Sequence, residues 1–383
     1  MANLVSQLAF GLLAMTITLP SMQDWPAEFG ASQAAVQLTF SGFIVAFGGL
    51  QLAYGAVSDR VGRKPLLLLG LMLAMLGSLA AALAPNLLML TLARVLQGAG
   101  AAAGMVLGRA MVQDLFDGPE RTKMMAFIGM TMGVCPPVAT LIGGQLHVRF
   151  GWRANFVLVT LVACVLLLAA WRGLPSRAPD TAGKASGLRE LLAGYRRLMR
   201  EPGFLLYVTM LASTTATFYT FLGGAPIVLK AYGVTPERVG WYIMCIPIAY
   251  IFGNLWTSRL IRGSSDRRIM ALGQVFTVCG LLLVLALGLA GAGSPLALAL
   301  PLLLLGVGHG LLAPPTLAAT VGLVPALAGS AAAVGGLLQQ VSGGVGAFAV
   351  GLVPHDGQVN LALLMLAWTA CGAAAQWLLR RRR

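Results

Sequence analysis

Twelve apolar segments follow one another along the chain and constrain its fold more than any other feature of the sequence. Each is long enough to cross the hydrocarbon core of a bilayer, which takes about 20 residues in a helix. All are expected to be helices, because an isolated strand cannot satisfy its backbone hydrogen bonds in lipid. The predicted spans are residues 4–22, 34–57, 65–84, 87–111, 124–147, 153–173, 203–229, 239–262, 269–291, 295–320, 327–351 and 358–379.

The composition also indicates an all-α integral membrane protein. Of the 383 residues, 58% are hydrophobic and only 10% are charged, whereas a soluble domain carries about 25% charged residues. The net charge of +14 comes from basic residues spread over the loops rather than gathered in one compact basic domain. This distribution argues against a nucleic-acid partner and favours a role in membrane topology.

No pattern in the sequence points to an enzyme, a bound metal or a cofactor. The five cysteines lie inside apolar segments without the spacing of disulfides or metal ligands, so we expect them to be small packing residues. The sequence contains no nucleotide-binding loop, catalytic triad or cluster of metal ligands. The glycine-rich stretches 98–108 and 335–346 are typical of closely packed membrane helices.

The distribution of Lys and Arg residues predicts the orientation in the membrane. With the N-terminus in the cytoplasm, 21 basic residues fall in cytoplasmic segments and four fall on the other face. We therefore expect a multi-pass protein of a bacterial-type inner membrane with both termini cytoplasmic. The first residues lack the basic region of a signal peptide, so residues 4–22 are expected to form a span. No basic residue precedes that span, which leaves open a short leader upstream of Met1.

The longest polar stretch, residues 174–202, divides the spans into six and six. It contains proline, glycine and several arginines, and we interpret it as a cytoplasmic linker. It would join an N-terminal six-helix bundle, residues 1–173, to a C-terminal six-helix bundle, residues 203–383. Residues 188–200 are predicted to form an amphipathic helix that lies on the membrane, where its basic face would favour anionic lipid.

One polar loop, between the second and third spans, carries a distinctive motif. The string Gly-x-x-x-Asp-Arg-x-Gly-Arg-Lys combines glycines, which allow a sharp turn, with charges that must stay at the membrane surface. A degenerate copy, Gly253–Arg259, lies between the second and third spans of the other half, which indicates duplication. The alternative is an ordinary basic loop at the membrane edge. The fixed residues of the motif are Gly55, Asp59, Arg60, Gly62, Arg63 and Lys64.

The motif and its setting resemble the corresponding loop of Major Facilitator Superfamily transporters. Other strings are similar to the Bcr/CflA-like group of twelve-span drug:proton antiporters, most closely in the N-terminal half. They are Leu19-Pro20, Gly30-Ala31-Ser32, Val36-Gln37-Leu38, Arg94-Val95-Leu96-Gln97-Gly98, Arg109, Asp114-Leu115-Phe116, Glu120-Arg121, Gly151-Trp152-Arg153 and Gln339. The resemblance implies two pseudo-symmetric halves that hold a substrate near the midplane and export it in exchange for protons. It also implies that Asp59 latches one state against a helix N-terminus.

Two positions depart from this group. Thr16 stands where the group usually has an aspartate in its first helix, so the carboxylate that would drive antiport is missing. In the fifth helix Ala139-Thr140 replaces the usual Gly-Pro pair, while Gly143-Gly144 is kept. Pro136-Pro137 lies upstream and is expected to kink this helix, because proline removes a backbone donor and clashes with the preceding turn.

Arg94 is the charged residue expected deepest inside a span. A cation buried in lipid is costly unless it faces water or a partner. One interpretation places Arg94 in a central cavity, as a switch linked to substrate or protons. The alternative is a structural arginine that donates hydrogen bonds to helix carbonyls.

The sequence does not identify the group that would carry a proton, because all twelve acidic residues fall in loops or at helix ends. Asp24 is either a substitute for the missing carboxylate or an ordinary residue of an outer loop. His309, between two glycines, either titrates near neutral pH or packs as a structural residue. Including side chains that offer aromatic, flexible or polar surface, the candidates for substrate contact or proton coupling are Arg94, Thr16, Gln97, Met130, Phe218, Tyr219, His309 and Gln339.

Together these features predict a secondary transporter that exports small amphipathic molecules, drug-like compounds or metabolites, by alternating access. The expected partners are a small-molecule substrate, protons and membrane lipids, and we expect a monomer without cofactors. Two alternatives remain open. One is an exporter or uniporter that is not coupled to protons, and the other is a non-transporting membrane sensor on the same fold.

Overall fold

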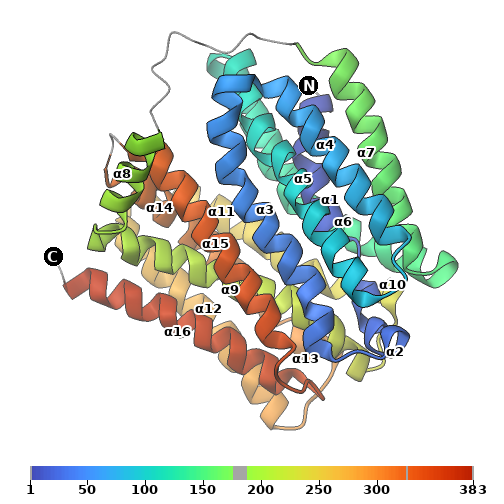
Figure 1. Ribbon diagram of the computed structural model, residues 1–383. Coiled ribbons are helices and arrows are strands. Elements are labelled where there is room, and N and C mark those ends of the chain that lie inside the picture. Colours follow the sequence, from blue (N-terminus) through green and yellow to red (C-terminus); the bar gives the residue numbers. More distant parts are fainter. Residues whose placement is uncertain (1, 176–187, 325–326, 382–383) are drawn as a thin grey trace. The chain divides into compact units, whose positions relative to one another are not determined.

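The computed structural model describes residues 2–175, 188–324 and 327–381, and in these residues all regular secondary structure is helical. The chain divides into two units, residues 1–185 and 186–383 (Figure 1). All twelve predicted spans fall on helices. Eleven helical segments in the described part of the chain are long and apolar enough to cross a membrane. The remaining predicted span lies in α6 (Gly118–Phe150), whose 33 residues give it sufficient length.

In unit 1, α5 packs along both α3 and α4, and α1 lies against α5, α6 and α7 (Figure 1). Glycines allow this close packing: a Cβ on Gly98 would overlap with the carbonyl group of Phe43 in α3, and one on Gly100 with the backbone of Ala74 in α4. Polar groups of α5 are thereby brought next to the backbones of its neighbours. The elements of unit 1 are α1 (Ala2–Thr16), η1 (Pro20–Gln23), α2 (Trp25–Phe29), α3 (Gln33–Val61), α4 (Arg63–Ala82), α5 (Leu87–Leu115), α6 and α7 (Arg153–Gly173).

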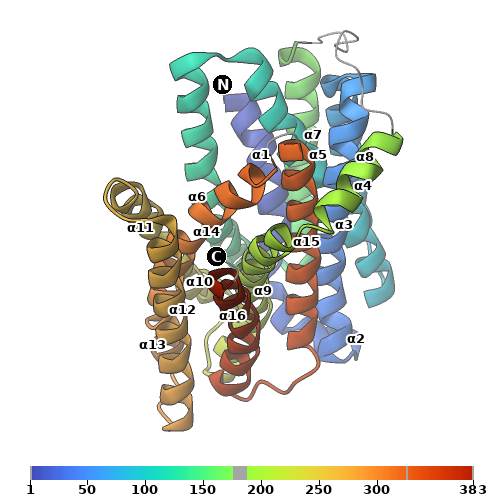
Figure 2. The same cartoon turned by 90° about the vertical axis from the view of Figure 1, so that its left-hand side faces the viewer.

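In unit 2, α9 packs against α15 and α16, and α14 packs against α11 and α12 (Figure 2). The contact between α11 and α14 is again backbone to backbone, since a Cβ on Gly253 would overlap with the carbonyl oxygen of Val307. The elements described in unit 2 are α8 (Leu188–Leu198), α9 (Pro202–Ala231), α10 (Pro236–Ile243), α11 (Cys245–Leu260), α12 (Asp266–Leu289), α13 (Pro295–Ala299), α14 (Leu302–Gly322), α15 (Ala328–Val350) and α16 (Gln358–Arg381).

Three of the predicted spans are divided into shorter helices next to a proline. Within residues 295–320, Pro301 lies between α13 and α14. Within residues 4–22, α1 ends at Thr16, four residues before Pro20. Within residues 239–262, α10 ends at Ile243, four residues before Pro247. A proline has no backbone N–H, and its ring clashes with the carbonyl group four residues earlier, so both helices end where this clash begins.

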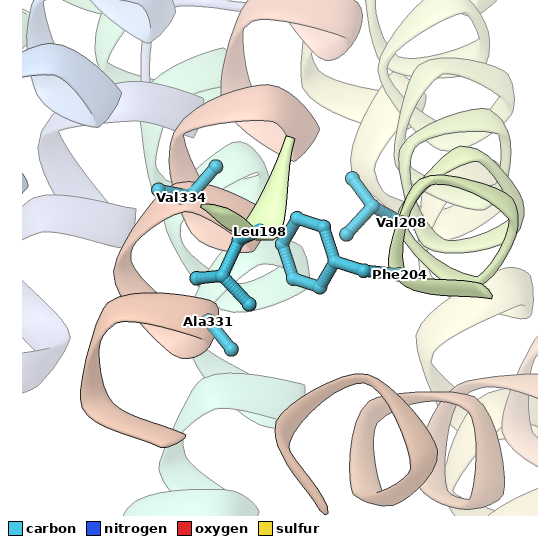
Figure 3. Packing of buried hydrophobic residues seen from close by; sticks show 5 residues of the cluster. All are labelled: Leu198, Phe204, Val208, Ala331 and Val334. Atoms are coloured by element: carbon cyan, nitrogen blue, oxygen red, sulfur yellow. The ribbon is translucent and has the colours of Figure 1, made fainter. Parts of the chain in front are cut away.

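The amphipathic helix expected in the linker forms as α8, and its last turn packs against neighbouring helices. The side chain of Leu198 is buried in an apolar cluster between α8, α9 and α15, with partly buried Tyr195 packed beside it. The C-terminal part of α8 therefore packs against α9 and α15, and contact of the rest of the helix with the membrane stays a prediction. Residues 176–187 of the predicted linker lie outside the described residues. The other buried members of the cluster are Phe204, Val208, Ala331 and Val334 (Figure 3).

Candidate functional site

Arg94 lies in a polar network inside unit 1, where its side chain is 1% exposed. Its guanidinium donates to the carbonyl oxygens of Ala14 at 2.8 Å and Met15 at 3.3 Å, both on α1. It also donates to the side-chain carbonyl oxygen of Gln97. Gln97 in turn donates to the hydroxyl group of Ser78, on α4, at 2.8 Å. The network therefore ties α1, α4 and α5 together.

Two aromatic rings complete the surroundings of Arg94. Its Cζ atom lies 4.4 Å from the ring centroid of Phe43, on α3, and 5.8 Å from that of Phe156, on α7. A cation is attracted by the electron-rich face of such a ring, most strongly where water is excluded. Arg94 thus makes the hydrogen bonds to helix carbonyls that one of the two interpretations expected, while its role in substrate binding or proton coupling stays a prediction.

The end of α1 explains why its carbonyl oxygens can accept from a side chain. The amide of Leu19 donates to the carbonyl oxygen of Thr16 at 3.1 Å instead of continuing the α-helical pattern to Met15. The last carbonyls of a helix lack intrahelical partners and carry partial negative charge, which favours a cation nearby. Arg94 therefore caps α1 from a neighbouring helix.

Thr16 occupies the last turn of α1 and is buried. Its hydroxyl group donates to the carbonyl oxygen of Leu12 at 2.8 Å. Its own carbonyl oxygen accepts a hydrogen bond from the hydroxyl group of Thr140, on α6, at 3.4 Å. Thr16 therefore joins α1 to α6 through neutral groups, at the position where a carboxylate was expected from the resemblance.

The glycine pair of α6 lies at this same contact. Gly143 and Gly144 are both buried, and a Cβ on Gly143 would overlap with the carbonyl oxygen of Ile17. Upstream, Pro136-Pro137 is buried inside α6, which continues as a helix through both prolines. The end of α1 and the C-terminal part of α6 are therefore in backbone contact.

The motif that begins at Gly55 is more helical than the sequence indicated. The second span was predicted to end at residue 57, whereas α3 continues to Val61. Gly55 has open space around the position of a Cβ. Gly62 separates α3 from α4 with a φ of +95°, a backbone conformation that favours glycine. The side chains of Asp59 and Arg60 lie outside the described residues, so the latch assigned to Asp59 stays a prediction.

The two basic residues that begin α4 attach it to other helices. Arg63 forms an ion pair with Asp114, near the end of α5, and the two side chains are 29% and 32% exposed. Lys64 donates to the carbonyl oxygen of Leu174, just after α7, at 2.7 Å. The start of α4 is therefore fastened to the ends of both α5 and α7.

In unit 2, a polar seam joins α9 to α15. The hydroxyl group of Tyr219 donates to the side-chain oxygen of Gln340 at 3.1 Å. One turn earlier, the hydroxyl group of Thr215 donates to the side-chain oxygen of Gln339 at 3.2 Å. Phe218 is half-buried, with its ring centroid 5.9 Å from that of Tyr219. The structure thus brings three of the candidates together.

The other candidates lie apart from these groups. His309 is buried on α14, between Gly308 and Gly310. Met130 lies on α6 and is 54% exposed. The predicted residues therefore form two groups, one around Arg94 and one along the seam of unit 2, with His309 and Met130 outside both.

Two polar contacts near the turn between α6 and α7 were not predicted from the sequence. Nε2 of His147, in the last turn of α6, lies 3.0 Å from Oδ2 of Asp24, between η1 and α2. The indole N–H of Trp152 donates to the carboxylate of Glu28 at 3.3 Å, and Arg153 lies 3.8 Å from the same carboxylate. The basic residues that flank the turn between α6 and α7 were the available signal, but their acidic partners are far away in sequence.

Comparison with known proteins matches residues 4–347 to the Major Facilitator Superfamily. The chain is 30% identical over 366 residues to the multidrug resistance protein D of Escherichia coli, across 94% of this chain and 91% of that protein. It is 26% identical over 287 residues to a bicyclomycin resistance protein homolog of Haemophilus influenzae, across 73% of this chain and 72% of that protein.

Among solved structures, that of a peptide transporter POT in complex with alafosfalin has the same fold, with a TM-score of 0.78 at 16% identity. The match covers 99% of this chain and 93% of that one. The relatives named for multidrug and bicyclomycin resistance confirm the resemblance to the Bcr/CflA-like group. The chain is a multi-pass membrane protein that belongs to the Major Facilitator Superfamily, whose members are transporters and not enzymes.

Proposed function

We propose that the chain is a secondary active transporter that exports small amphipathic molecules across the inner membrane by alternating access, with both termini in the cytoplasm. The observation that carries this proposal is the similarity to a multidrug resistance protein across 94% of the chain. The similarity to a bicyclomycin resistance protein homolog supports drug-like cargo. The exporter would act as a monomer, surrounded by membrane lipids.

The transporter would consist of two six-helix bundles, residues 1–173 and 203–383, joined by the cytoplasmic linker 174–202. On this proposal, Tyr219, Gln339 and Phe218 contact the cargo from α9 and α15. Their side chains combine aromatic surface with hydroxyl and amide groups, which suits amphipathic molecules of varied shape. Because Tyr219 and Gln339 already take part in hydrogen bonds within the seam, a cargo molecule would exchange one partner for another rather than uncover a lone polar group.

The contacts of Arg63 and Lys64 support a gate at the cytoplasmic end of unit 1. An ion pair and a charge-assisted hydrogen bond fasten the start of α4 to the ends of α5 and α7. Both contacts are partly exposed, so each is weak enough to break and re-form during a transport cycle. We propose that Asp59 and Arg60 belong to the same gate, with Gly55 and Gly62 permitting its backbone to adjust.

The proposed function includes the exchange of the cargo for protons. The family resemblance supports it, but the contacts of Thr16 and Arg94 favour a second candidate function, an exporter or uniporter that is not coupled to protons. Thr16 has no proton to exchange near neutral pH, and the guanidinium of Arg94 is already hydrogen-bonded to backbone carbonyls. Coupling would therefore need a titratable group elsewhere in the chain.

Transport by the purified protein in liposomes distinguishes these functions. We expect drugs from a panel to accumulate inside liposomes when a pH gradient is imposed, and to accumulate several-fold less without it. Accumulation that is equal with and without the gradient would contradict antiport and leave export standing. Absence of movement for every drug in the panel would contradict export. The variant Thr16→Asp, which restores a carboxylate, is expected to steepen the dependence on the gradient.

A further inference from the structure

The end of α8 has two faces of opposite character. Leu198 and, beside it, the partly buried Tyr195 face the apolar cluster that α8 shares with α9 and α15 (Figure 3). The side chains of Arg196, Arg197 and Arg200 are exposed. Successive residues of a helix are rotated by about 100°, so the three arginines share one arc of the surface, turned away from the buried residues.

The chain passes from α8 into α9 through a single helical turn. The amide of Arg200 donates to the carbonyl oxygen of Arg197 at 3.1 Å. The amide of Glu201 donates to that of Leu198 at 3.0 Å. α9 then begins at Pro202 and is long and apolar enough to cross a membrane. Its 30 residues rise about 45 Å, the thickness of a bilayer with its headgroups. We therefore expect the end of α8 at the level of the headgroups.

The positive charge of this face is not neutralised within the described part of the chain. None of the three arginines takes part in an ion pair with another described residue. The acidic neighbour, Glu201, turns toward the start of α9, since a Cβ on Gly203 would lie 3.6 Å from its Oε1. This position suits a carboxylate, because the N-terminal end of a helix carries partial positive charge. The arginine face is thus left for an anion from outside the chain.

An apolar side chain at the edge of the arginine face favours a lipid over a soluble anion. Met199 is 45% exposed, and around the helix it falls between Tyr195 and Arg196. A phospholipid offers a phosphate group beside an acyl chain. A guanidinium can donate two parallel hydrogen bonds to a phosphate, while the stem of an arginine covers apolar surface. A phospholipid therefore matches both parts of this surface.

We propose that Arg196, Arg197 and Arg200 bind the headgroups of anionic phospholipids, while Leu198 stays packed in the apolar cluster on the opposite side of the helix. Met199 then contacts the acyl chains beneath the headgroups. The partner is the surface of an anionic bilayer, which attracts basic residues that flank a membrane span. The lipid surface does not depend on what the protein transports, so it goes beyond the proposed function.

Lipid binding has a physical consequence for α8. A ligand that binds the arginines as the helix arranges them stabilises the helix against local unfolding. Because α8 packs on the first turns of α9 and α15, the lipid would also steady the starts of the two helices that carry the polar seam of unit 2. Whether this affects transport rests on the proposed function, whereas lipid binding itself does not.

Hydrogen exchange of the backbone amides of α8 tests the surface, measured by mass spectrometry on the full-length protein in nanodiscs. One set of nanodiscs contains phosphatidylcholine alone, and the other contains equal parts of phosphatidylcholine and the anionic phosphatidylglycerol. We expect exchange in α8 to be several-fold slower in the anionic nanodiscs. The difference is expected to shrink at high salt, because salt screens exposed charges.

Two triple variants show whether the arginine face is responsible. The first, Arg196→Gln with Arg197→Gln and Arg200→Gln, is expected to lose the difference between the two lipids. The control removes the same charge from three exposed arginines between the end of α11 and the first turn of α12, and it should keep the wild-type response. These substitutions are Arg262→Gln, Arg267→Gln and Arg268→Gln. Thermal unfolding in phosphatidylcholine nanodiscs shows that each variant is folded.

Several outcomes would contradict the proposal. Equal exchange of α8 in both kinds of nanodisc would overturn it, as would a difference that persists in the folded first variant. Loss of the response in the control would mean that net charge, not this face, decides. Slower exchange caused by inorganic phosphate in phosphatidylcholine nanodiscs would replace the bilayer by a soluble anion. Failure of drug transport with an intact lipid response would contradict the proposed function and leave the lipid surface standing.

Discussion

The guanidinium of Arg94 donates to the carbonyl oxygen of Ala14 at 2.8 Å, and this contact closes the end of α1. The cation lies where the helix dipole is negative, beneath the ring of Phe43. Arg94, on α5, is therefore bound to the backbone of α1.

Replacing Arg94 tests this architectural role. Arg94→Ala leaves the carbonyl oxygens of Ala14 and Met15 and the side chain of Gln97 without their donor, and each buried unsatisfied group costs about 1–3 kcal/mol. We expect the midpoint of thermal unfolding in detergent to fall markedly. Arg172→Ala, at the exposed end of α7, is the control, with a change within about 0.5 kcal/mol. Equal stability of the two variants would contradict the capping role.

Gly143→Ala tests the backbone contact between α1 and α6. The added methyl group would overlap with the carbonyl oxygen of Ile17, so the helices must separate at a cost of about 1–3 kcal/mol. We expect lower thermal stability and loss of drug transport. Gly336→Ala in α15 is the matched control, because nothing lies within 4 Å of the position of its Cβ. A wild-type phenotype for Gly143→Ala would show that the two helices do not touch there.

Charge reversal at Arg63 and Asp114 tests the proposed gate. Because both side chains are partly exposed, each single reversal, Arg63→Asp or Asp114→Arg, should change the free energy of unfolding by less than about 1 kcal/mol. The rate of drug transport in liposomes is nevertheless expected to fall several-fold in each variant. The double exchange should recover it. If all three proteins transport at the wild-type rate, the basic residues serve topology alone.

Two adjacent residues test how α8 is held. Leu198 is buried in the cluster of Figure 3, whereas Met199 is 45% exposed. Leu198→Ala is expected to lower the free energy of unfolding by about 2–5 kcal/mol, because it leaves a cavity. Met199→Ala should change it by no more than about 0.5 kcal/mol. Similar effects of the two substitutions would mean that α8 does not dock on α9 and α15. Thermal unfolding in detergent measures both.

The positions of the helices were predictable because each span is recognised from the hydrophobicity and length of one continuous stretch of sequence. Every predicted span lies on a helix, and the positions of Pro20 and Pro247 account for where α1 and α10 end. The docking of α8 was not predictable in the same way. An amphipathic pattern shows that Leu198 needs an apolar surface, but whether lipid or protein supplies it depends on the path of the linker.

Individual residues of the candidate site were predictable from the sequence, but the contacts between them were not. The cost of burying a charge selected Arg94, and the resemblance to a family motif selected Gln97. Two of the partners of Arg94 are backbone oxygens on another helix, however, and backbone atoms carry no sequence signal. His147 was missed for a related reason. Its significance comes from Asp24, which is 123 residues away and reaches it only through the fold.

Liposomes loaded with a pH-sensitive dye test the central claim most directly, because they report proton movement while a drug is supplied. With drug on one side only and no initial pH difference, antiport predicts that protons move against the drug and that the internal pH changes at once. The response should disappear when protein or drug is omitted. Transport of the drug without any change of internal pH would contradict the coupled exporter.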